Sequence, residues 1–350
     1  MKVVSVVNQK GGCGKTTVAV NLAACLAAAG ERVLLIDMDP QGHAGLALGT
    51  HGDGLEATMY NVLTDKEEDQ APLSEILLEK DDKLWLAPSN ILLSAVEQQL
   101  AGKKRREDRL REHLAQGVSS YDYCVIDCPP SVGLLTMNAL RASQVALIPV
   151  DMSPFSLQAI RRLSDTIQVL CSRASHMIRM RVVANMVDAR TNFSRRMLEA
   201  LKKDYEGILC KTIIHRTVRL TEGALHGVPV RRLAPYSTAH EDFADLTMEL
   251  ATADADLFDI PAPFFSEILF SYPDPGAHEV QVAGDFNNWA PSGSHTLTRG
   301  EDGKWKLCLP LKPGRYQYKF IVDGQWLEDP SNPAQVIGEF GQRNSVLEVS

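Results

Sequence analysis

The sequence lacks the features of a disulfide-bonded, secreted or membrane-spanning chain. Its seven cysteines are an odd number, scattered singly among 350 residues, which disfavours a disulfide framework. No segment approaches the roughly 20 uncharged apolar residues that a membrane-spanning helix needs. The amino terminus enters a strand pattern at once, without the layout of a signal peptide. These absences predict a cytoplasmic protein with reduced thiols and no membrane attachment.

A general excess of positive charge is also missing. The 44 acidic residues outnumber the 36 lysines and arginines, so the formal net charge is −8. Any contact with nucleic acid must therefore come from a local patch. A zinc site is not indicated either. Cys124 and Cys128 flank Asp127, but no second pair of cysteines or histidines stands at ligand spacing, so buried structural cysteines are favoured.

What the chain does contain is a glycine-rich loop, KGGCGKTT at residues 10–17, directly after the apolar run 3–7. Consecutive glycines let backbone N–H groups wrap a polyphosphate, and the helix that begins near Thr16 adds the positive end of its dipole. The strict pattern GxxxxGK followed by Ser or Thr is not met, because Gln9 replaces its first glycine and Lys10 is an additional cation. A glycine-rich turn without a ligand is the alternative. The strand before the loop and the helix pattern after it favour the phosphate loop.

The loop predicts ATP or a similar nucleoside triphosphate, with Mg²⁺, as its ligand. In a loop of this type the ammonium group of Lys15 lies at the β- and γ-phosphates. The hydroxyl group of Thr16 lies at Mg²⁺. These roles follow from the position of each residue in the loop.

Three acidic residues at predicted strand ends fit the same ligand. Asp37 closes the run 33–36 and is followed by Asp39, and Asp127 closes the run 123–126. Carboxylates at such ends can hold the water shell of Mg²⁺ or orient an attacking water. A lone aspartate after a strand is usually a turn or cap residue. Three of them beside a phosphate loop favour roles toward metal and water.

Residues 1 to about 250 alternate short β-branched runs with longer amphipathic patterns. Helices are predicted at 17–29 and 156–171. The strand candidates, most of them apolar on both faces, are 3–7, 33–36, 123–126, 145–150, 181–186 and 208–214. This alternation predicts an α/β fold with a doubly wound, mostly parallel sheet of the P-loop NTPase type.

The composition and the hydrophobic pattern of the sequence change at about Ala251. Residues 251–263 are acidic, then proline-bearing, and predict a linker. Beyond them, short strands alternate with turn signals such as Asp323-Gly324, which predicts a small all-β sandwich at 264–350. The predicted organisation is therefore an ATPase domain at 1–250, a linker, and a β domain.

Five segments of the first domain carry a family resemblance. They read KGGCGKTT, LLIDMDPQG, YDYCVIDCPPS, RTNFSRRMLEAL and IIHRTVRLTEGALHGVPV. Over about 250 residues they resemble the ParA/Soj/MinD family of deviant Walker ATPases. The resemblance implies slow, Mg²⁺-dependent ATP hydrolysis that a partner protein stimulates, and a homodimer that forms when ATP is bound.

The same resemblance assigns roles to residues. Lys10 is the lysine that reaches across the dimer to the partner's phosphates, so the catalytic residues are Lys10, Lys15 and Asp39, the last positioning the hydrolytic water. The metal residues are Thr16, Asp37 and Asp127. The residues implied to bind nucleotide, with Asn185 in the region that contacts adenine in relatives, are Gly11, Gly12, Cys13, Gly14, Lys15, Thr16, Thr17 and Asn185.

Members of this family bind nucleoid DNA or membrane. Membrane-bound relatives end in a basic amphipathic helix, whereas the stretch after Glu249 is acidic here. DNA-bound relatives present arginines from the edge of the dimer, and the candidates are Arg195, Arg196, Arg216, Arg219, Arg231 and Arg232. Phosphate contacts by these side chains would be independent of DNA sequence and would weaken with salt. The basic run 103–106 is followed by Glu107, Asp108 and Glu112 and is interpreted as a solvated face.

The second domain has motifs of its own. They are FNNW at 286–289, YKF at 318–320, DGQW at 323–326 and GQRN at 341–344. These resemble the glycogen-binding module of the AMP-activated kinase β subunit, a carbohydrate-binding module of the CBM48 type. The resemblance implies that the residues binding an α-glucan are Trp289, Lys319, Trp326, Phe340, Gln342 and Asn344.

The physical chemistry of these residues agrees with a sugar site. A flat apolar ring suits the C–H face of a sugar, and flanking donors and acceptors fix its orientation. Two tryptophans in a small β domain are more often core residues, but Trp289 and Trp326 stand next to turn residues, which favours exposure. No pair of carboxylates suited to glycoside hydrolysis accompanies them, so the domain is predicted to bind glucan and not to cleave it.

Two functions follow as hypotheses. In the first, an ATP-switched dimer positions or partitions a glycogen-associated cargo on the nucleoid. In the alternative, a glucan-sensing ATPase regulates an enzyme without a role for DNA. ATP-dependent amide synthesis is disfavoured, because the chain has no recognisable glutaminase or acceptor domain.

Overall fold

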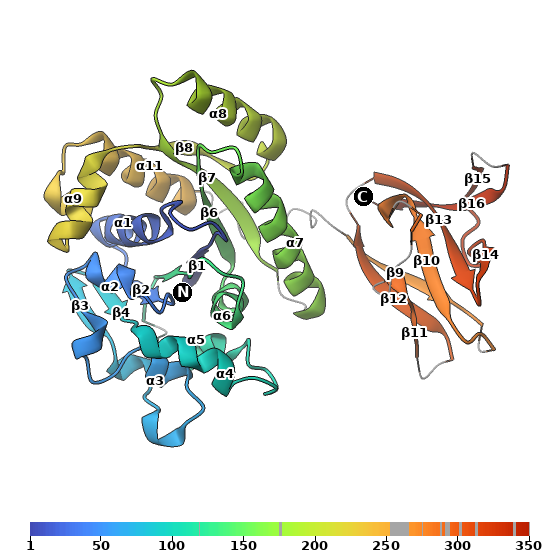
Figure 1. The fold of residues 1–350 in the computed structure, drawn as a ribbon, viewed down its shortest axis with the longest axis horizontal. Helices are drawn as coiled ribbons and strands as arrows, with labels where there is room; N and C mark the ends of the chain where they lie inside the picture. The colour runs from blue at the N-terminus through green and yellow to red at the C-terminus, as the bar shows by residue number, and fades with distance from the viewer. Residues whose placement is uncertain are drawn as a thin grey trace. The chain divides into compact units, whose positions relative to one another are not determined.

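A computed structural model describes residues 1–118, 120–174, 177–252, 266–274, 276–287, 289–290, 295–300, 303–311, 314–338 and 341–349. The chain divides into two compact units, residues 1–257 and 258–350, and each is described by itself (Figure 1). The predicted linker falls almost wholly on residues outside the described ranges. Among the described residues, no helix combines the length and the apolarity that crossing a bilayer requires.

The first unit is built on an eight-stranded sheet with the strand order β3-β4-β2-β5-β1-β6-β7-β8. Neighbouring strands run parallel, except that β3 and β4 form an antiparallel hairpin at one edge. The strands are β1 (Lys2–Val6), β2 (Val33–Asp37), β3 (Leu78–Asp81), β4 (Leu84–Ala87), β5 (Tyr123–Asp127), β6 (Val145–Asp151), β7 (Arg179–Val187) and β8 (Leu209–His215). The predicted mostly parallel sheet is confirmed, although the sequence patterns gave no indication of β3 and β4.

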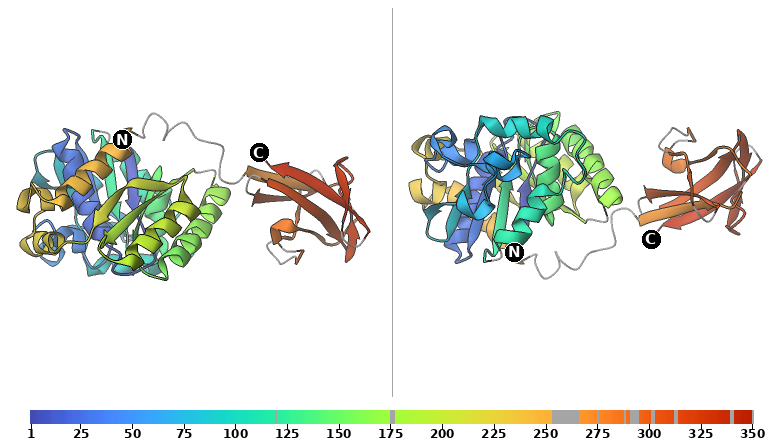
Figure 2. Two further views of the ribbon diagram at one scale, coloured as in Figure 1. Left: turned by 90° about the horizontal axis from the view of Figure 1, so that it is seen from above. Right: turned by 90° about the horizontal axis from the view of Figure 1, so that it is seen from below.

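Helices cover both faces of this sheet. The α-helices are α1 (Lys15–Ala28), α2 (His43–Leu46), α3 (Met59–Leu63), α4 (Val96–Gln99), α5 (Arg109–Gly117), α6 (Leu134–Ala142), α7 (Ser156–Ala174), α8 (Asn192–Tyr205), α9 (Val218–His226), α10 (Val230–Leu233) and α11 (Thr238–Thr252). Short 3₁₀ turns are η1 (Gly52–Gly54), η2 (Glu67–Asp69), η3 (Leu73–Glu75) and η4 (Ile91–Ala95). Figure 2 shows the layered arrangement from two further directions.

Alternation along the strands explains the two apolar layers. On β2, Leu34 and Ile36 pack in the cluster that includes residues of α3, α5, α6, α7 and α8, whereas Val33 and Leu35 pack in the cluster with α1, α2, α10 and α11. Successive side chains of a strand point to opposite faces, so a strand buried between two helical layers must be apolar throughout. The doubly wound fold follows from these runs.

The second unit is an antiparallel β-sandwich. One sheet has the order β10-β13-β16-β15, with β14 paired to β13, and the other has the order β11-β12-β9. The elements are β9 (Ser266–Tyr272), β10 (Val280–Gly284), η5 (Asp285–Asn287), β11 (Thr298–Arg299), β12 (Trp305–Leu311), β13 (Gly314–Val322), β14 (Gln325–Leu327), β15 (Gln335–Ile337) and β16 (Arg343–Val349). Phe270 of β9 and Phe320 of β13 lie in one apolar cluster, so the two sheets share a core, as predicted for this domain.

Candidate functional site

The glycine-rich loop lies between β1 and α1, at the carboxyl edge of the sheet. Gly12 and Gly14 have left-handed backbones, with φ of 74° and 87°. A side chain at Gly14 is excluded for a second reason, because its Cβ would lie 2.3 Å from Nδ2 of Asn185. Lys15 is buried and donates to the carbonyl oxygen of Lys10 at 3.1 Å, across the loop. The ammonium group of Lys15 therefore lies at the backbone of the loop, where the phosphates of a nucleotide are expected.

Asn185, at the end of β7, holds the loop from the other side. Its Nδ2 donates to the carbonyl oxygen of Cys13 at 2.8 Å, and its Oδ1 accepts from the N–H of Met186 at 2.9 Å. The side chain is only 2% exposed. Sequence similarity placed this residue near adenine, and the structure gives it contacts to the backbone of the loop.

Two aspartates lie side by side at the ends of β2 and β5. Asp37 and Asp127 are paired in register on these neighbouring strands. The oxygens of Asp37 accept from the backbone N–H groups of Asp39, Ala44 and Gly45 at 3.0–3.2 Å, so this carboxyl group caps the start of α2. Burial raises the pKa of Asp37 from 3.8 to about 7, although these N–H groups oppose the shift.

Asp127 differs from Asp37 in its hydrogen bonding. Both of its oxygens are fully buried and, among the described residues, no donor reaches either one in hydrogen-bond geometry. Burial and the neighbouring Asp37 raise the pKa of Asp127 well above 3.8, while the adjacent hydroxyl group of Thr16 lowers it. An unsatisfied buried carboxyl beside a phosphate loop and a threonine hydroxyl fits a hydrated Mg²⁺.

The surroundings also suit a cation held mainly by phosphate and water. Within the described part of the chain, no group of three Asp, Glu, His or Cys side chains converges as a metal site. Mg²⁺ usually takes one or two carboxylates and completes its shell with phosphate oxygens and water. Asp39 lies close by and is buried, and its Oδ1 accepts from the N–H of Gln41 at 3.0 Å.

Lys10 is engaged within its own chain. Its Nζ lies 2.5 Å from Oδ2 of Asp151 at the end of β6 and 2.6 Å from Oγ of Ser153. Ser156 donates to the other oxygen of Asp151 at 2.8 Å, which fixes the carboxylate. A Lys10 side chain that reaches a second subunit must first leave this pair.

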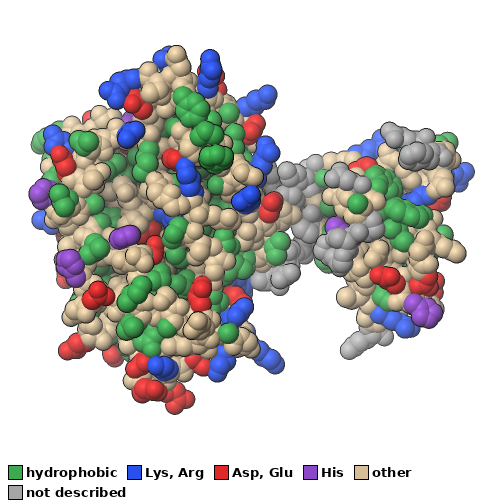
Figure 3. All heavy atoms as spheres, in the orientation of Figure 1, with side chains coloured by type: hydrophobic (Ala, Val, Ile, Leu, Met, Phe, Trp, Pro, Cys, Tyr) green, Lys and Arg blue, Asp and Glu red, His purple; other side chains and the backbone are tan. Residues whose placement is uncertain are grey.

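The arginines considered for DNA lie on three parts of the first unit. Arg195 and Arg196 are exposed on α8, and Figure 3 shows lysine and arginine side chains over the region of α7 and α8. Arg216 is exposed just after β8, whereas Arg219 pairs with Glu222 at 2.9 Å. Arg232 of α10 is exposed.

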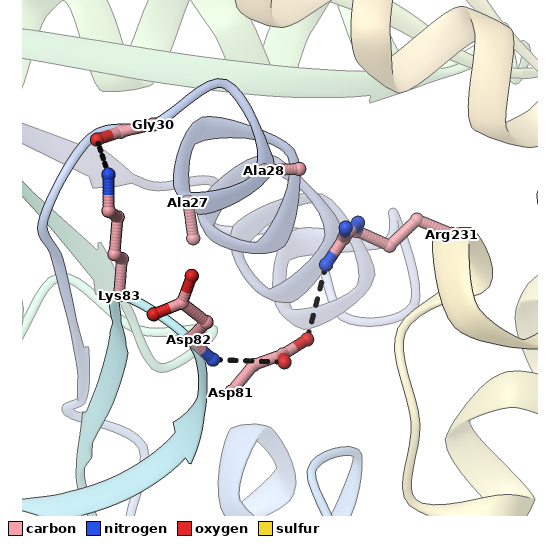
Figure 4. A pocket seen from close by; sticks show the side chains of 7 residues that line it. All are labelled: Ala27, Ala28, Gly30, Asp81, Asp82, Lys83 and Arg231. Atoms are coloured by element: carbon pink, nitrogen blue, oxygen red, sulfur yellow. Dashed lines mark hydrogen bonds and ion pairs between the residues drawn. The ribbon is translucent and has the colours of Figure 1, made fainter.

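Arg231, the sixth arginine, lines a pocket and pairs with Asp81 at 3.1 Å (Figure 4). In the same pocket, Nζ of Lys83 donates to the carbonyl oxygen of Gly30 at 2.7 Å. Charges of opposite sign line this pocket, which gives it no preference for a charged ligand. Arg231 is therefore less available to phosphates than the arginines of α8.

The second unit brings most of the expected sugar residues to one face. On β13, Tyr318, Phe320 and Val322 point into the core, so the alternate residues, including Lys319, lie on the outer face. Trp326 of β14 is paired with Ile321 of this face and is 43% exposed. The rings of Trp289 and Trp326 have centroids 6.3 Å apart and planes inclined by 33°.

Polar groups border these rings. Nζ of Lys319, a residue only 6% exposed, donates to Oε1 of Gln342 at 3.1 Å, and Nδ2 of Asn344 donates to Oε1 of Gln317 at 3.0 Å. Phe340, also expected at this site, lies outside the described residues. Sequence reasoning missed Gln317, and it missed Asp285, which accepts from the indole of Trp289 at 3.0 Å. Asp285 directly precedes the FNNW motif in the sequence, but its hydrogen bond to the indole of Trp289 could not be predicted from that position.

Comparisons with known proteins cover both units. The family described as an AAA domain matches residues 1–182, and the glycogen recognition site of AMP-activated protein kinase matches residues 267–350. The sporulation initiation inhibitor protein Soj of Bacillus subtilis is 39% identical over 251 residues, which are 71% of this chain and 98% of that protein. The chromosome partitioning protein ParA of Myxococcus xanthus is 36% identical over 255 residues, 72% of this chain and 89% of that protein.

A solved structure with the same fold is cobyrinic acid a,c-diamide synthase from Mycobacterium smegmatis, crystallised with an ATP analog and magnesium. Its TM-score is 0.64 at 28% sequence identity, and the alignment covers 75% of this chain and 98% of that one. The sequence relatives and the phosphate loop with its second lysine agree with this fold. The chain therefore belongs to the ParA/Soj family of P-loop ATPases, and it carries a glycogen-recognition module after the ATPase domain.

Proposed function

We propose that this protein forms a dimer when ATP is bound, binds an α-glucan and positions a glycogen-associated cargo on the nucleoid. The observation that carries the proposal is the presence, in one chain, of a two-lysine phosphate loop and a glycogen-recognition module. Two relatives, at 39% and 36% identity, are named for sporulation control and chromosome partitioning, so these proteins guide the proposal more than the synthase does.

The amino-terminal domain binds ATP with Mg²⁺ and hydrolyses it. The glycines of the loop and Lys15 hold the phosphates, and Thr16 with Asp127 holds the cation, because the oxygens of Asp127 have no other partner among the described residues. When bound, Mg²⁺ neutralises charge that develops on the phosphate oxygens. Asp37 keeps α2 in place and supports the metal site from its strand end, and Asp39 orients the attacking water.

Lys10 acts in the dimer. A second cation at the γ-phosphate stabilises the charge that spreads over its oxygens in the transition state. In the single chain Lys10 is held by Asp151 and Ser153, so ATP-dependent pairing exchanges this ion pair for a contact with the partner's phosphates. ATP thereby favours the dimer, and hydrolysis loosens it. A partner protein that reorganises this region would stimulate turnover.

The carboxyl-terminal module takes an α-glucan. The planes of Trp289 and Trp326 are inclined by 33°, so two rings stacked on them cannot be coplanar. Consecutive glucose rings of a curved α-linked chain meet this inclination, whereas the flat ribbon of a β-linked chain does not. Lys319, Gln342 and Asn344 supply the hydrogen bonds to the hydroxyl groups.

Dimerisation changes the strength of glucan binding. Two modules in one dimer make binding to a branched polymer bivalent, which can raise apparent affinity by roughly 10²–10⁴. Arg195 and Arg196 of α8, with Arg216 and Arg232, supply contacts to DNA phosphates. The same dimer would thus connect a glycogen granule to DNA while ATP is bound.

Co-sedimentation with glycogen tests this function in the full-length chain. The Asp39→Ala variant, in which turnover is blocked, is pelleted with ATP, with ADP and without nucleotide. We expect the glycogen concentration for half-pelleting to fall at least tenfold with ATP compared with ADP. Equal pelleting with both nucleotides contradicts the ATP switch, and no pelleting in any condition contradicts glucan binding.

A gel shift with unrelated DNA tests the role of the nucleoid. Binding that needs ATP and weakens steeply between 50 and 200 mM salt, as expected for phosphate contacts, supports positioning. The regulatory alternative has some support, because Arg219 and Arg231 are already paired with carboxylates. Glycogen-dependent ATP turnover in the absence of any DNA binding would favour that alternative.

A further inference from the structure

Trp289 has an unusual backbone and a fixed ring. Its φ is 59°, a left-handed conformation that residues other than glycine seldom adopt. Its N–H donates to the carbonyl oxygen of Gly284 at 2.9 Å, and its indole Nε1 donates to Oδ1 of Asp285 at 3.0 Å. A side chain in such a backbone conformation is normally held there by its surroundings. Asp285 is the part of those surroundings that acts on the ring.

The second oxygen of Asp285 is fixed by another strand. Oδ2 accepts from the backbone N–H of Gln317 on β13 at 2.7 Å, so the carboxylate connects the indole to the sheet. This connection requires the turn that follows β10 to approach β13 closely. A Cβ at Gly284 would lie 2.4 Å from the carbonyl oxygen of Gln317, so only glycine permits the approach.

Gln317 extends the connection to the far side of the site. Its Oε1 accepts from Nδ2 of Asn344 on β16 at 3.0 Å. Trp289 and Asn344, two residues expected to contact the sugar, are thus joined through Asp285 and Gln317. Each oxygen of Asp285 thus accepts one hydrogen bond from a donor within the protein.

We propose that Asp285 is a positioning residue of the glucan site, holding the Trp289 indole so that its face and that of Trp326 form one inclined platform before the sugar arrives. The proposal rests on the glucan-binding function proposed above. It also implies that the indole N–H is used within the protein and that Trp289 offers the sugar its ring face alone. Preorganisation of this kind raises affinity by reducing the ordering that binding requires.

The test measures affinity of the full-length protein for maltoheptaose by calorimetry. Asp285→Ala should weaken binding about 3- to 10-fold, the effect expected when one large side chain must be ordered on binding. Glu348→Gln, which removes an exposed carboxylate on β16 of the same unit, is the matched control and should leave affinity unchanged. Trp289→Phe keeps a stacking ring but lacks the indole N–H.

A double-mutant cycle separates positioning from direct contact. If Asp285 acts through the indole, Asp285→Ala should have no further effect in the Trp289→Phe background. In the free protein, the ¹⁵N–¹H resonance of the Trp289 indole, assigned by its loss in Trp289→Phe, should shift in Asp285→Ala and stay in place in Glu348→Gln. A change in folding stability alone would not move this one resonance.

The outcomes are distinct. Equal weakening by Asp285→Ala in both backgrounds means that the carboxylate contacts the sugar itself, and overturns the proposal. Unchanged affinity in Asp285→Ala overturns it as well. Absence of maltoheptaose binding by the unmodified protein contradicts the glucan function, which is a different failure from either of these.

Discussion

At the scale of the residue, Asp37 and Asp127 show how neighbouring carboxyl groups take different tasks. Three backbone N–H groups occupy Asp37, whereas the oxygens of Asp127 have no aligned donor among the described residues. Both groups are fully buried, and burial raises both pKa values. An empty, buried carboxyl is costly unless a cation or a proton occupies it. Binding of a cation beside Asp127 would therefore offset the free-energy cost of burying its carboxyl group.

This arrangement predicts a pH dependence of stability. The pKa of Asp37 is about 7 in the folded chain against 3.8 as the ordinary value, so between about pH 4 and pH 7 the folded chain holds a proton that the unfolded chain has released. The free energy of unfolding therefore falls as pH rises through this window, because the folded chain must release a proton that burial of Asp37 favours.

Thermal denaturation without Mg²⁺ checks this dependence. We expect Tm to be lower at pH 8 than at pH 5, and Asp127→Asn, which removes one of the two neighbouring buried acids, to reduce the difference. Asp53→Asn, at an exposed position of η1, is the control and should retain it. A Tm that rises from pH 5 to pH 8 in the unmodified protein would contradict the argument.

A second residue-scale prediction concerns Lys10. Lys10→Ala should leave ATP binding intact, because Lys15 still lies in the loop, and should lower stimulated hydrolysis by about 10²–10³-fold, the effect of losing one transition-state donor. Asp151→Asn breaks the same ion pair but leaves the cation, so its hydrolysis should fall much less. Turnover assays with a nucleotide-binding control compare the two. Equal losses would mean that the ion pair matters and the reach of Lys10 does not.

At the scale of the element, α11 protects the open edge of the sheet. β8 pairs with β7 on one side, and on the other side carboxylates of α11 accept from its backbone. Glu249 accepts from the N–H groups of Lys211 and Thr212 at 2.7 and 2.9 Å, and Asp242 accepts from that of His215 at 2.8 Å. An unpaired edge strand is a template for pairing with another chain, and these acids occupy its donors.

Hydrogen exchange tests this protection. In Glu249→Ala, the amides of Lys211 and Thr212 lose a charged acceptor, and their exchange should accelerate by about 10-fold or more, which corresponds to roughly 1.5–3 kcal/mol for bonds to a charged group. Asp245→Asn, on an exposed position of the same helix, should leave these two amides unchanged. The idea fails if Lys211 and Thr212 exchange at the same rate in Glu249→Ala as in the unmodified protein.

At the scale of the whole molecule, the chain divides into two compact units. Each has its own apolar core, and the phosphate loop and the tryptophan pair lie on different units. Communication between ATP and glucan therefore need not pass through packed side chains. In the proposed dimer it can arise from valency, because ATP-dependent pairing would double the number of modules in one particle.

Valency makes a reciprocal prediction. If ATP-dependent pairing strengthens glucan binding, a glucan that bridges two modules must favour pairing by the same factor. A long amylose should lower the concentration at which the Asp39→Ala variant dimerises in ATP, as measured by analytical ultracentrifugation. Maltoheptaose, which offers far fewer binding positions than a long amylose, should not, and Trp289→Ala/Trp326→Ala should abolish the effect of amylose. An equal effect of both sugars would indicate a change within the chain and exclude valency as the cause.

Sequence patterns predicted the fold of both units where local rules were sufficient. Short β-branched runs, most of them apolar on both faces, marked β1, β2, β5, β6, β7 and β8, as expected for strands covered by helices. The hairpin β3–β4 was missed, since Lys80, Asp81, Asp82 and Lys83 interrupt its apolar residues. At an edge, a strand can carry charges that a central strand cannot.

The sequence by itself determined which chemistry this protein has. The features that carry this chemistry are local ones: the loop of glycines and two lysines, the aspartates after strands and the tryptophans beside turns. Local features can be recognised from the order of residues along a chain. Only the tertiary structure decided which of these groups already have a hydrogen-bond or ion-pair partner within the chain. Asp37 accepts hydrogen bonds from α2, and the indole of Trp289 donates to Asp285. Lys10 forms an ion pair with Asp151, and Arg231 forms one with Asp81. Lys10 and Arg231 lie 141 and 150 residues from their partners in the sequence, so only folding brings these groups into range and alignment. Asp285 is only four residues from Trp289, but the N–H of Gln317 on another strand fixes its carboxylate.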